Sequence, residues 1–412
     1  SDFISGGEGN DNISTGTGDD TLLGGEGDDT LTNSDGDDSL DGGEGNDSLV
    51  ATGGYDTLRG GEGDDTLSGG ADDDLLIGGA DNDSMDGGAG DELFYGDDPN
   101  EITVSIGGTS RAGLNPKFEV FANGVLIYTG EVTWAKDGDF DSTAPGAFQD
   151  VYIPITGDLP ENVQVVFVND SEPGDNGTPG DRNLHLDSIK VGDTTYEAES
   201  DATTSGGIDN GDNYNLFGQG NSATFDTSGA ERTTGNDSMA GGDGADTFAF
   251  SDGFGDDTVI GGEGGDDQDL VDLSNLTGPV TVTYSSSEEG TITDSDGNTI
   301  AFSEVERIVT TNQADSVDGT NSGEGINVST GDGNDTILYG DGDNTVSSGD
   351  GNDYIDDEAG NPGYTGNNSV DAGRGNDTVY SGYGNDTITG GEGNDHLHGQ
   401  HGKDSIDGGN GD

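Results

Sequence analysis

The chain has 412 residues, of which 87 are acidic and 10 basic, and its formal net charge is −77. Only 27% of the residues are hydrophobic and 80 are glycine, so an ordinary apolar core cannot offset the entropy lost on folding, and bound cations are the obvious substitute. The charge disfavours nucleic acids and anionic lipids as partners, no apolar run is long enough for membrane insertion, and the absence of cysteine excludes disulfides.

Residues 6–95 consist of ten consecutive nonapeptides without an insertion. Glycine is common at the first, second and fourth places, and an aliphatic, methionine or phenylalanine side chain fills the eighth. A period of nine with one apolar residue per repeat fits a short strand and a tight turn, and fits no helix. An acid fills every sixth place: Asp11, Asp20, Asp29, Asp38, Asp47, Asp56, Asp65, Asp74, Asp83 and Glu92.

This pattern predicts a parallel β-solenoid. Places seven to nine form a strand whose eighth side chain points inward, and places one to six form a turn in which glycine permits positive φ. Two nonapeptides make one coil, so each sixth-place aspartate lies near its counterpart 18 residues away. Ca²⁺ between such carboxylates and the turn carbonyls would have an all-oxygen shell, so we expect multiple calcium ions with the nine aspartates as ligands.

The repeat resembles that of RTX proteins, the hemolysin-type calcium-binding family, whose consensus is G-G-x-G-x-D-x-U-x. Asp72 and Asp81 replace the fourth-place glycine, and Thr15, Asn33 and Ala51 replace the first, so we expect weaker calcium binding in those turns. The resemblance implies a secreted, extracellular or cell-surface protein, exported by type I secretion from a Gram-negative bacterium.

The composition changes in residues 101–226, where β-branched and aromatic stretches separated by turns predict an antiparallel β-sandwich with its own core. Two of its strands flank the acid-rich stretch "NDSEPGDNGTPGDR", residues 169–182. Several oxygen ligands on one glycine- and proline-containing loop indicate a calcium site.

This loop and the strand after it resemble those of calcium-dependent xylan-binding carbohydrate-binding modules of families 36 and 60. The resemblance implies that sugar hydroxyls complete the shell of a partly uncovered calcium ion; a wholly structural calcium is the alternative. Asp187 would bind a second, structural ion. The residues implied for the calcium and the carbohydrate are Asp170, Asp175, Asp181, Arg182 (through backbone carbonyls) and Asn183.

The nonapeptide returns after the sandwich. Residues 232–262 form a short RTX segment, residues 263–309 lose the period and alternate like antiparallel strands that cap or join rolls, and residues 310–412 form a C-terminal RTX roll interrupted at 357–362. The further candidate calcium ligands are Asp237, Asp246, Asp335, Asp353, Asp377, Asp386, Asp395 and Asp404.

A histidine cluster lies near the end of this roll. His396 and His398 flank the eighth-place Leu397 and should therefore point outward. A solvent-facing pair is the simpler interpretation, and a zinc site is the alternative.

The expected fold is all-β: parallel β-roll segments (residues 1–96, 232–262 and 310–412) flanking an antiparallel β-sandwich (residues 101–226). The expected function is that of a calcium-dependent adhesive or matrix protein that binds a diol-bearing, xylan-like polysaccharide. No H-E-x-x-H or G-x-S-x-G motif is present, and we expect no enzymatic activity.

Two other functions fit the same features. One is a self-assembling surface-layer or filament subunit, since both chain ends fall within a nonapeptide and head-to-tail association would complete the shared turns. The other is the non-catalytic portion of a larger secreted enzyme.

Overall fold

The structure is a computed structural model. The residues that it describes are 1–97, 101–110, 117–123, 125–131, 136–137, 149–154, 162–167, 183–191, 194–197, 202–205, 207–209, 214–216, 222–226, 235–262, 268–323, 325–357 and 365–411. The chain forms two compact units, residues 1–98 with 234–412 and residues 99–233. The regular elements in the described ranges are all strands, and no helix there is long and apolar enough to cross a membrane.

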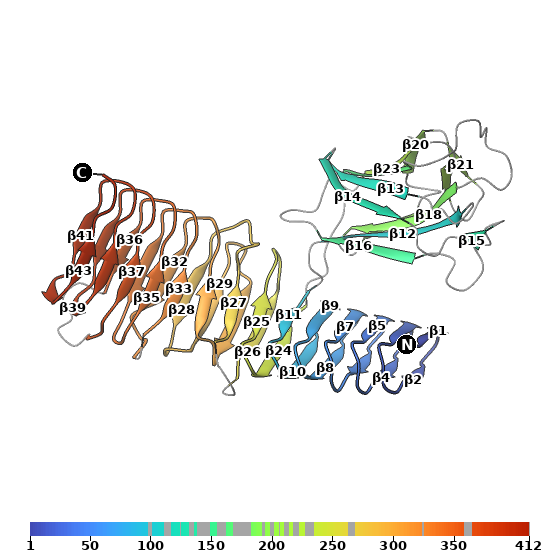
Figure 1. Ribbon diagram of the computed structural model, residues 1–412, viewed down its shortest axis with the longest axis horizontal. Helices are drawn as coiled ribbons and strands as arrows, with labels where there is room; N and C mark the ends of the chain where they lie inside the picture. Colours follow the sequence, from blue (N-terminus) through green and yellow to red (C-terminus); the bar gives the residue numbers. More distant parts are fainter. Residues whose placement is uncertain are drawn as a thin grey trace. The chain divides into compact units, whose positions relative to one another are not determined.

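The first unit is a parallel β-roll with two long sheets, seen from blue to red in Figure 1. In hydrogen-bonding order the first sheet contains β1 (Phe3–Glu8), β3 (Thr21–Glu26), β5 (Ser39–Glu44), β7 (Thr57–Glu62), β9 (Leu75–Ala80), β11 (Leu93–Tyr95), β25 (Thr247–Ala249), β27 (Leu270–Asp272), β31 (Arg307–Val309), β33 (Asn327–Ser329), β35 (Thr345–Ser347), β37 (Ser369–Asp371), β40 (Thr387–Thr389) and β43 (Ser405–Asp407).

The second sheet of the roll takes the alternate nonapeptides. It contains β2 (Asn12–Ser14), β4 (Thr30–Thr32), β6 (Ser48–Val50), β8 (Thr66–Ala71), β10 (Ser84–Ala89), β24 (Ser238–Asp243), β26 (Asp256–Ile260), β30 (Thr299–Ser303), β29 (Glu289–Thr293), β28 (Thr281–Tyr284), β32 (Ser316–Gly319), β34 (Thr336–Tyr339), β36 (Tyr354–Asp356), β38 (Thr378–Tyr380) and β41 (His396–His398). A small additional sheet pairs β39 (Tyr383–Gly384) with β42 (His401–Gly402). The predicted all-β fold with a parallel roll is confirmed.

In the regular first half of the roll the coil length is 18 residues, as the nonapeptide predicts. Leu22 pairs with Leu40 in the first sheet and Leu31 with Leu49 in the second. These eighth-place side chains are buried between the two sheets and form the narrow core. The apolar residue of each repeat therefore supplies its regular contribution to the core.

Several strands of the first half are longer than the predicted three residues. β3 continues through the first three places of the next repeat, and its first-place glycine is buried like the eighth-place leucine. Gly25, at the second place, has a φ of 118°, and a Cβ on it would lie 2.2 Å from the carbonyl oxygen of Gly7. Glycine thus lets successive coils approach closely while the strand continues, and the turn proper begins after the third place.

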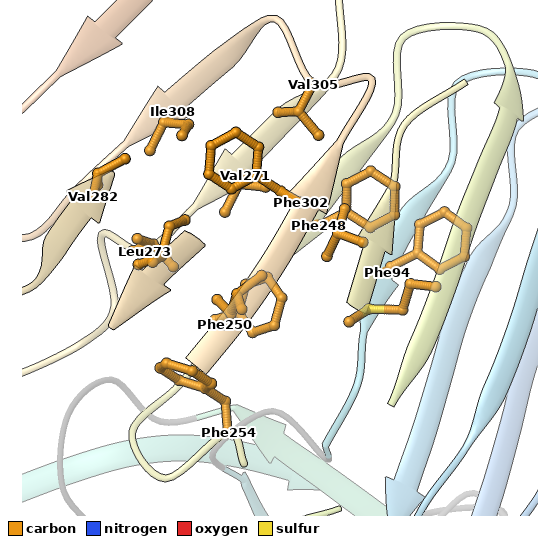
Figure 2. Packing of buried hydrophobic residues seen from close by; sticks show 14 of the residues in the cluster. Phe94, Phe248, Phe250, Phe254, Val271, Leu273, Val282, Phe302, Val305 and Ile308 are labelled. Carbon is orange, nitrogen blue, oxygen red and sulfur yellow. The ribbon is translucent and has the colours of Figure 1, made fainter. Parts of the chain in front are cut away.

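The roll continues directly across the inserted residues. β11 pairs with β25 and β10 with β24, which places Phe94 beside Phe248 and Met85 beside Met239. The two phenylalanine rings stack with their centroids 4.8 Å apart, and both lie in the buried row shown in Figure 2. The described residues of the four roll segments, in 1–97 and from 235 onward, therefore lie in one compact unit and share its two sheets.

The aperiodic residues 268–309 are built into the roll. β28, β29 and β30 pair antiparallel, while β30 joins β26 and β28 joins β32 in parallel. Tyr284 and Phe302 meet edge to face with centroids 5.4 Å apart, and both are buried. This meander widens the second sheet and keeps the core continuous.

The second unit contains two sheets of mainly antiparallel strands. One follows the order β15 (Lys136–Asp137), β12 (Glu101–Ser110), β18 (Asn183–Val191), β22 (Tyr214–Leu216) and β21 (Gly207–Asp209), with β16 (Gln149–Pro154) on β12 and β19 (Thr194–Glu197) on β18. The other follows β14 (Val125–Glu131), β13 (Lys117–Ala122), β17 (Asn162–Phe167), β23 (Ser222–Asp226) and β20 (Ala202–Ser205).

Both sheets of this unit contribute buried side chains. Val104 lies on the first sheet, and Phe118, Val120, Val163 and Val165 lie on the second; all five are fully buried. The unit thus has an apolar core of its own. The core of the roll is much narrower, because each of its sheets contributes a single row of apolar residues.

Candidate calcium sites

The sixth-place carboxylates form a ladder along the turns of the roll. The Asp29 N–H donates to Asp47 Oδ1 at 2.7 Å, and the Asp47 N–H donates to Asp65 Oδ1 at 2.7 Å. The ladder crosses the insertion without a break, since the Asp83 N–H donates to Asp237 Oδ1 at 2.8 Å. One oxygen of most of these carboxylates is therefore engaged by the backbone of the coil before it.

The other oxygen of most of these carboxylates is buried without a hydrogen-bond partner. A buried polar atom without a partner costs free energy, and a charged one costs more, so each such oxygen indicates a missing ligand. In the described part of the roll, an unpartnered Oδ2 occurs at Asp11, Asp29, Asp38, Asp47, Asp56, Asp65, Asp74, Asp83, Asp237, Asp257, Asp335, Asp353, Asp377 and Asp395.

Carbonyl oxygens converge on the same spaces. A Cβ placed on the first-place Gly60 would lie 2.2 Å from Asp65 Oδ2 and 2.5 Å from the carbonyl oxygen of Gly78. Gly42 has the equivalent surroundings, with Asp47 Oδ2 at 2.2 Å. First-place glycines such as these thus leave open a small space lined by a carboxylate oxygen and a backbone carbonyl, which is the ligand chemistry of Ca²⁺.

Burial makes these carboxylates unfavourable as bare anions. It raises the pKa of Asp65 to about 7 and that of Asp83 to about 9, with the charges of neighbouring aspartates adding to the rise and a backbone hydrogen bond opposing it. A divalent cation would supply the compensating charge. No three acidic or histidine side chains in the described ranges converge as a metal cluster, and the other oxygens at these spaces are backbone carbonyls.

The turns stack on two edges of the roll. We call the turns that lead into strands of the first sheet the first edge, and those that lead into strands of the second sheet the second edge. Of the predicted ligands, the structure places Asp20, Asp38, Asp56, Asp74, Asp246, Asp386 and Asp404 on the first edge. It places Asp11, Asp29, Asp47, Asp65, Asp83, Asp237, Asp335, Asp353, Asp377 and Asp395 on the second edge.

The first edge changes chemistry in the C-terminal part of the roll. Its sixth places there hold Ile326, Asn344 and Asn368 before Asp386. Asn344 keeps the ladder bond, since its Oδ1 accepts the Ile326 N–H at 2.9 Å, while its Nδ2 donates to the carbonyls of Gly340 and Gly342 at 3.2 and 3.0 Å. An amide donor thus engages carbonyls in the turn and leaves no carboxylate to hold a cation.

Two carboxylates are satisfied by hydroxyl groups instead. Asp386 Oδ2 accepts the Ser381 hydroxyl at 2.7 Å, and Asp315 Oδ2 accepts the Thr310 hydroxyl at 2.6 Å. Asp386 therefore has both oxygens hydrogen-bonded, Oδ1 to the Asn368 N–H and Oδ2 to the Ser381 hydroxyl. The residues present fit calcium on both edges of the first half of the roll, and chiefly on the second edge of the C-terminal half.

Three buried acids join the ladder beyond the predicted ligands. The Asp237 N–H donates to Asp257 Oδ1, and the Asp246 N–H donates to Asp269 Oδ1, both at 2.8 Å. Asp257 keeps the spacing of the repeat, since the core residue Val259 follows two positions later. The nonapeptide period is interrupted around it, so Asp257 was not among the predicted ligands. Glu92 fills its sixth place with a longer side chain, and burial together with the neighbouring carboxylate of Asp246 raises its pKa to about 9.

The predicted ligands of the sandwich lie mostly outside the described residues. Asp170, Asp175, Asp181 and Arg182 fall in the connection between β17 and β18, of which the structure describes only the two flanking strands. Asn183 begins β18, and Asp187 lies within it. Because Ser105 pairs with Ser188 and Ile106 with Leu186, Asp187 is the extra residue of a β-bulge against β12.

Comparison with known families supports both parts. The model of the RTX calcium-binding nonapeptide repeat matches residues 1–31, 34–58, 41–76, 59–91, 68–98, 233–254, 327–355, 338–361, 363–382 and 380–412. A family described as a calcium-dependent, xylan-binding carbohydrate-binding module matches residues 101–206. No curated protein matches the chain.

Two solved structures of a module named vCBM60 are similar to part of the chain. One, in complex with galactobiose, is 21% identical, with a TM-score of 0.22, and the match covers 31% of this chain and 98% of that one. The other is a selenomethionine form, described with a circular permutation that links two families of calcium-dependent carbohydrate-binding modules. It is 21% identical, with a TM-score of 0.21 and coverage of 31% and 89%. The chain therefore contains RTX calcium-binding nonapeptide repeats, which bind multiple calcium ions, and between them a region that matches the calcium-dependent carbohydrate-binding module family.

Proposed function

We propose that this protein is a non-catalytic extracellular adhesive or matrix protein. The calcium-loaded roll would act as the scaffold, and the inserted module would bind a polysaccharide through a calcium ion of its 168–182 connection. The observation that carries the proposal is the carboxylate ladder, which runs through the coils on both sides of an insertion whose sequence matches a calcium-dependent carbohydrate-binding module.

Calcium chemistry supports the extracellular location. Extracellular calcium modules bind with dissociation constants of about 10⁻⁴ to 10⁻³ M, and at a hundredfold excess of calcium each occupied site stabilises the fold by roughly 2.7 kcal/mol. The buried carboxylates repel one another without the ion, so near neutral pH bound calcium should supply most of the stability of the roll. RTX repeats and carbohydrate-binding modules are both typical of secreted proteins.

Sugar chemistry supports a polysaccharide as the ligand. Neighbouring hydroxyl groups of a sugar are neutral oxygen donors that can displace water from a calcium ion. The family matched by residues 101–206 is described as xylan-binding, so xylan is the first polysaccharide to test. The proposal assigns no catalytic step, because the buried carboxylates of the roll are engaged in the ladder.

Isothermal titration of the full chain with soluble xylan tests this function. Binding should occur in calcium and disappear in chelator and in Asp181→Ala. Asp65→Asn is the control, because it removes a carboxylate of the roll and should leave xylan binding in excess calcium unchanged. Xylan binding that survives in Asp181→Ala would contradict the proposed site. Calcium-dependent assembly in light scattering without binding to xylan or other diol-bearing polysaccharides would favour a self-assembling structural subunit.

A further inference from the structure

A histidine pair stands on the outer face of the second sheet. β41 pairs with β38, which sets Thr378 beside His396 and Tyr380 beside His398. Leu397 between the histidines packs against the core of the roll, and both imidazoles are exposed. Their Nε2 atoms lie 3.0 Å apart.

This separation suits two ligands of one metal ion. With metal–nitrogen bonds of about 2.0 to 2.1 Å, two nitrogens at neighbouring coordination positions lie roughly 2.8 Å apart at a right angle and roughly 3.4 Å apart in a tetrahedron. A distance of 3.0 Å falls inside that range. In the absence of a metal, the same geometry lets one imidazole N–H donate to the other nitrogen.

Neighbouring rings hold the two imidazoles in place. The Tyr380 ring stacks on His398 with centroids 5.1 Å apart and an interplanar angle of 9°, and it meets His396 edge-on at 6.1 Å. Tyr354 lies on the other side of Tyr380, 6.3 Å away, and its hydroxyl donates to Asp356 at 2.5 Å. Contacts of this kind reduce the ordering cost that two free side chains would incur on binding a metal.

We propose that His396 and His398 form a two-nitrogen site for a transition-metal ion, with Cu²⁺ bound more tightly than Zn²⁺. Imidazole nitrogens suit copper, nickel and zinc, whereas Ca²⁺ requires oxygen ligands, so this site is chemically separate from the calcium turns. The net charge of −77 raises the local concentration of any cation. No third acidic or histidine side chain of the described ranges joins the pair, so water or a ligand from another molecule fills the remaining positions.

Copper titration of the full chain with calcium in excess tests the site, because calcium then occupies the carboxylate turns. Calorimetry should give one copper equivalent that is lost, or weakened at least tenfold, in either His396→Gln or His398→Gln. Zn²⁺ should bind the same site more weakly, and electron paramagnetic resonance of the copper complex should show coupling to two nitrogens.

His401→Gln provides the matched control. His401 stacks on Tyr383 with centroids 4.4 Å apart, and this variant should keep the copper affinity. Circular dichroism in calcium should be the same for all three variants, which separates metal binding from folding. Copper affinity unchanged in His396→Gln, or a copper spectrum without nitrogen coupling, would overturn the proposal; neither result bears on xylan binding.

Discussion

Replacing Asp65 by asparagine should stabilise the calcium-free roll and weaken the calcium-loaded one. Asp65 Oδ1 accepts the Asp47 N–H at 2.7 Å, while its Oδ2 is buried without a partner. Asn344 shows that an amide in the sixth place keeps the ladder bond and donates to turn carbonyls. The substitution therefore removes a buried charge while the ladder persists.

The size of the effect follows from the pKa of Asp65, which burial raises from 3.8 to about 7. The folded state holds the proton more tightly than the unfolded state, so the stability contributed by this group is full below the unfolded pKa and is lost as pH rises toward the folded one. Relative to low pH, where the group is protonated in both states, linkage gives a loss of folding stability of roughly 2 kcal/mol at about pH 5.5 and roughly 0.6 kcal/mol at about pH 4. The asparagine side chain carries no such proton, so the gain in Asp65→Asn should be larger at the higher pH.

Urea unfolding in chelator, followed by circular dichroism at the two pH values, measures this gain. The control is Asp64→Asn, which removes the same charge from an exposed neighbour that already accepts hydrogen bonds from Asn82. In calcium near neutral pH, Asp65→Asn should instead require more calcium to fold. The reasoning fails if Asp65→Asn destabilises the calcium-free protein, or if Asp64→Asn gives the same pH-dependent gain.

Four further substitutions, one of them with a matched control, test separate parts of the structure. Phe94→Ala removes a buried ring at the junction of the roll and should cost about 3 to 5 kcal/mol in urea unfolding with calcium. Gly60→Ala should abolish calcium binding in one turn by calorimetry, whereas Gly53→Ala should not, since the nearest atom to its Cβ would be 4.0 Å away. Asp72 has a φ of 74°, in the left-handed region that favours glycine. Asp72→Gly should therefore raise the free energy of unfolding by roughly 1 kcal/mol, and the thermal midpoint with it. Asn344→Asp should lower the stability of the roll in chelator, and calcium should restore that stability.

The regular part of the roll could be predicted from the sequence because its constraints are local. One acid and one apolar residue at fixed places in each nonapeptide set the strand, the turn and the 18-residue coil. Strand length was less predictable, because the extension of β3 through its first-place glycine depends on pairing with a neighbouring coil. The contact of Phe94 with Phe248 likewise depends on residues far apart in the sequence.

The candidate ligands were predictable only where the period was intact. Asp257 keeps the spacing to Val259, but the repeats around it are interrupted, so its place in the ladder emerges from the hydrogen bond with Asp237. The neutral side chains of Asn344 and Asn368 indicate that the first edge of the C-terminal half has fewer calcium ligands. Only the structure shows that the amide groups of these residues donate hydrogen bonds to backbone carbonyls instead. The ligands on residues 168–182 remain predictions.

Hydrogen exchange of the full chain, resolved by mass spectrometry with and without calcium, tests the central claim most directly. Calcium should strongly protect the backbone amides of residues 20–95 and 330–357, and chelator should remove that protection while β13 and β17, which have their own apolar core, keep much of theirs. Equal protection of the roll in chelator and in calcium would contradict the claim that calcium held by the sixth-place carboxylates folds this protein.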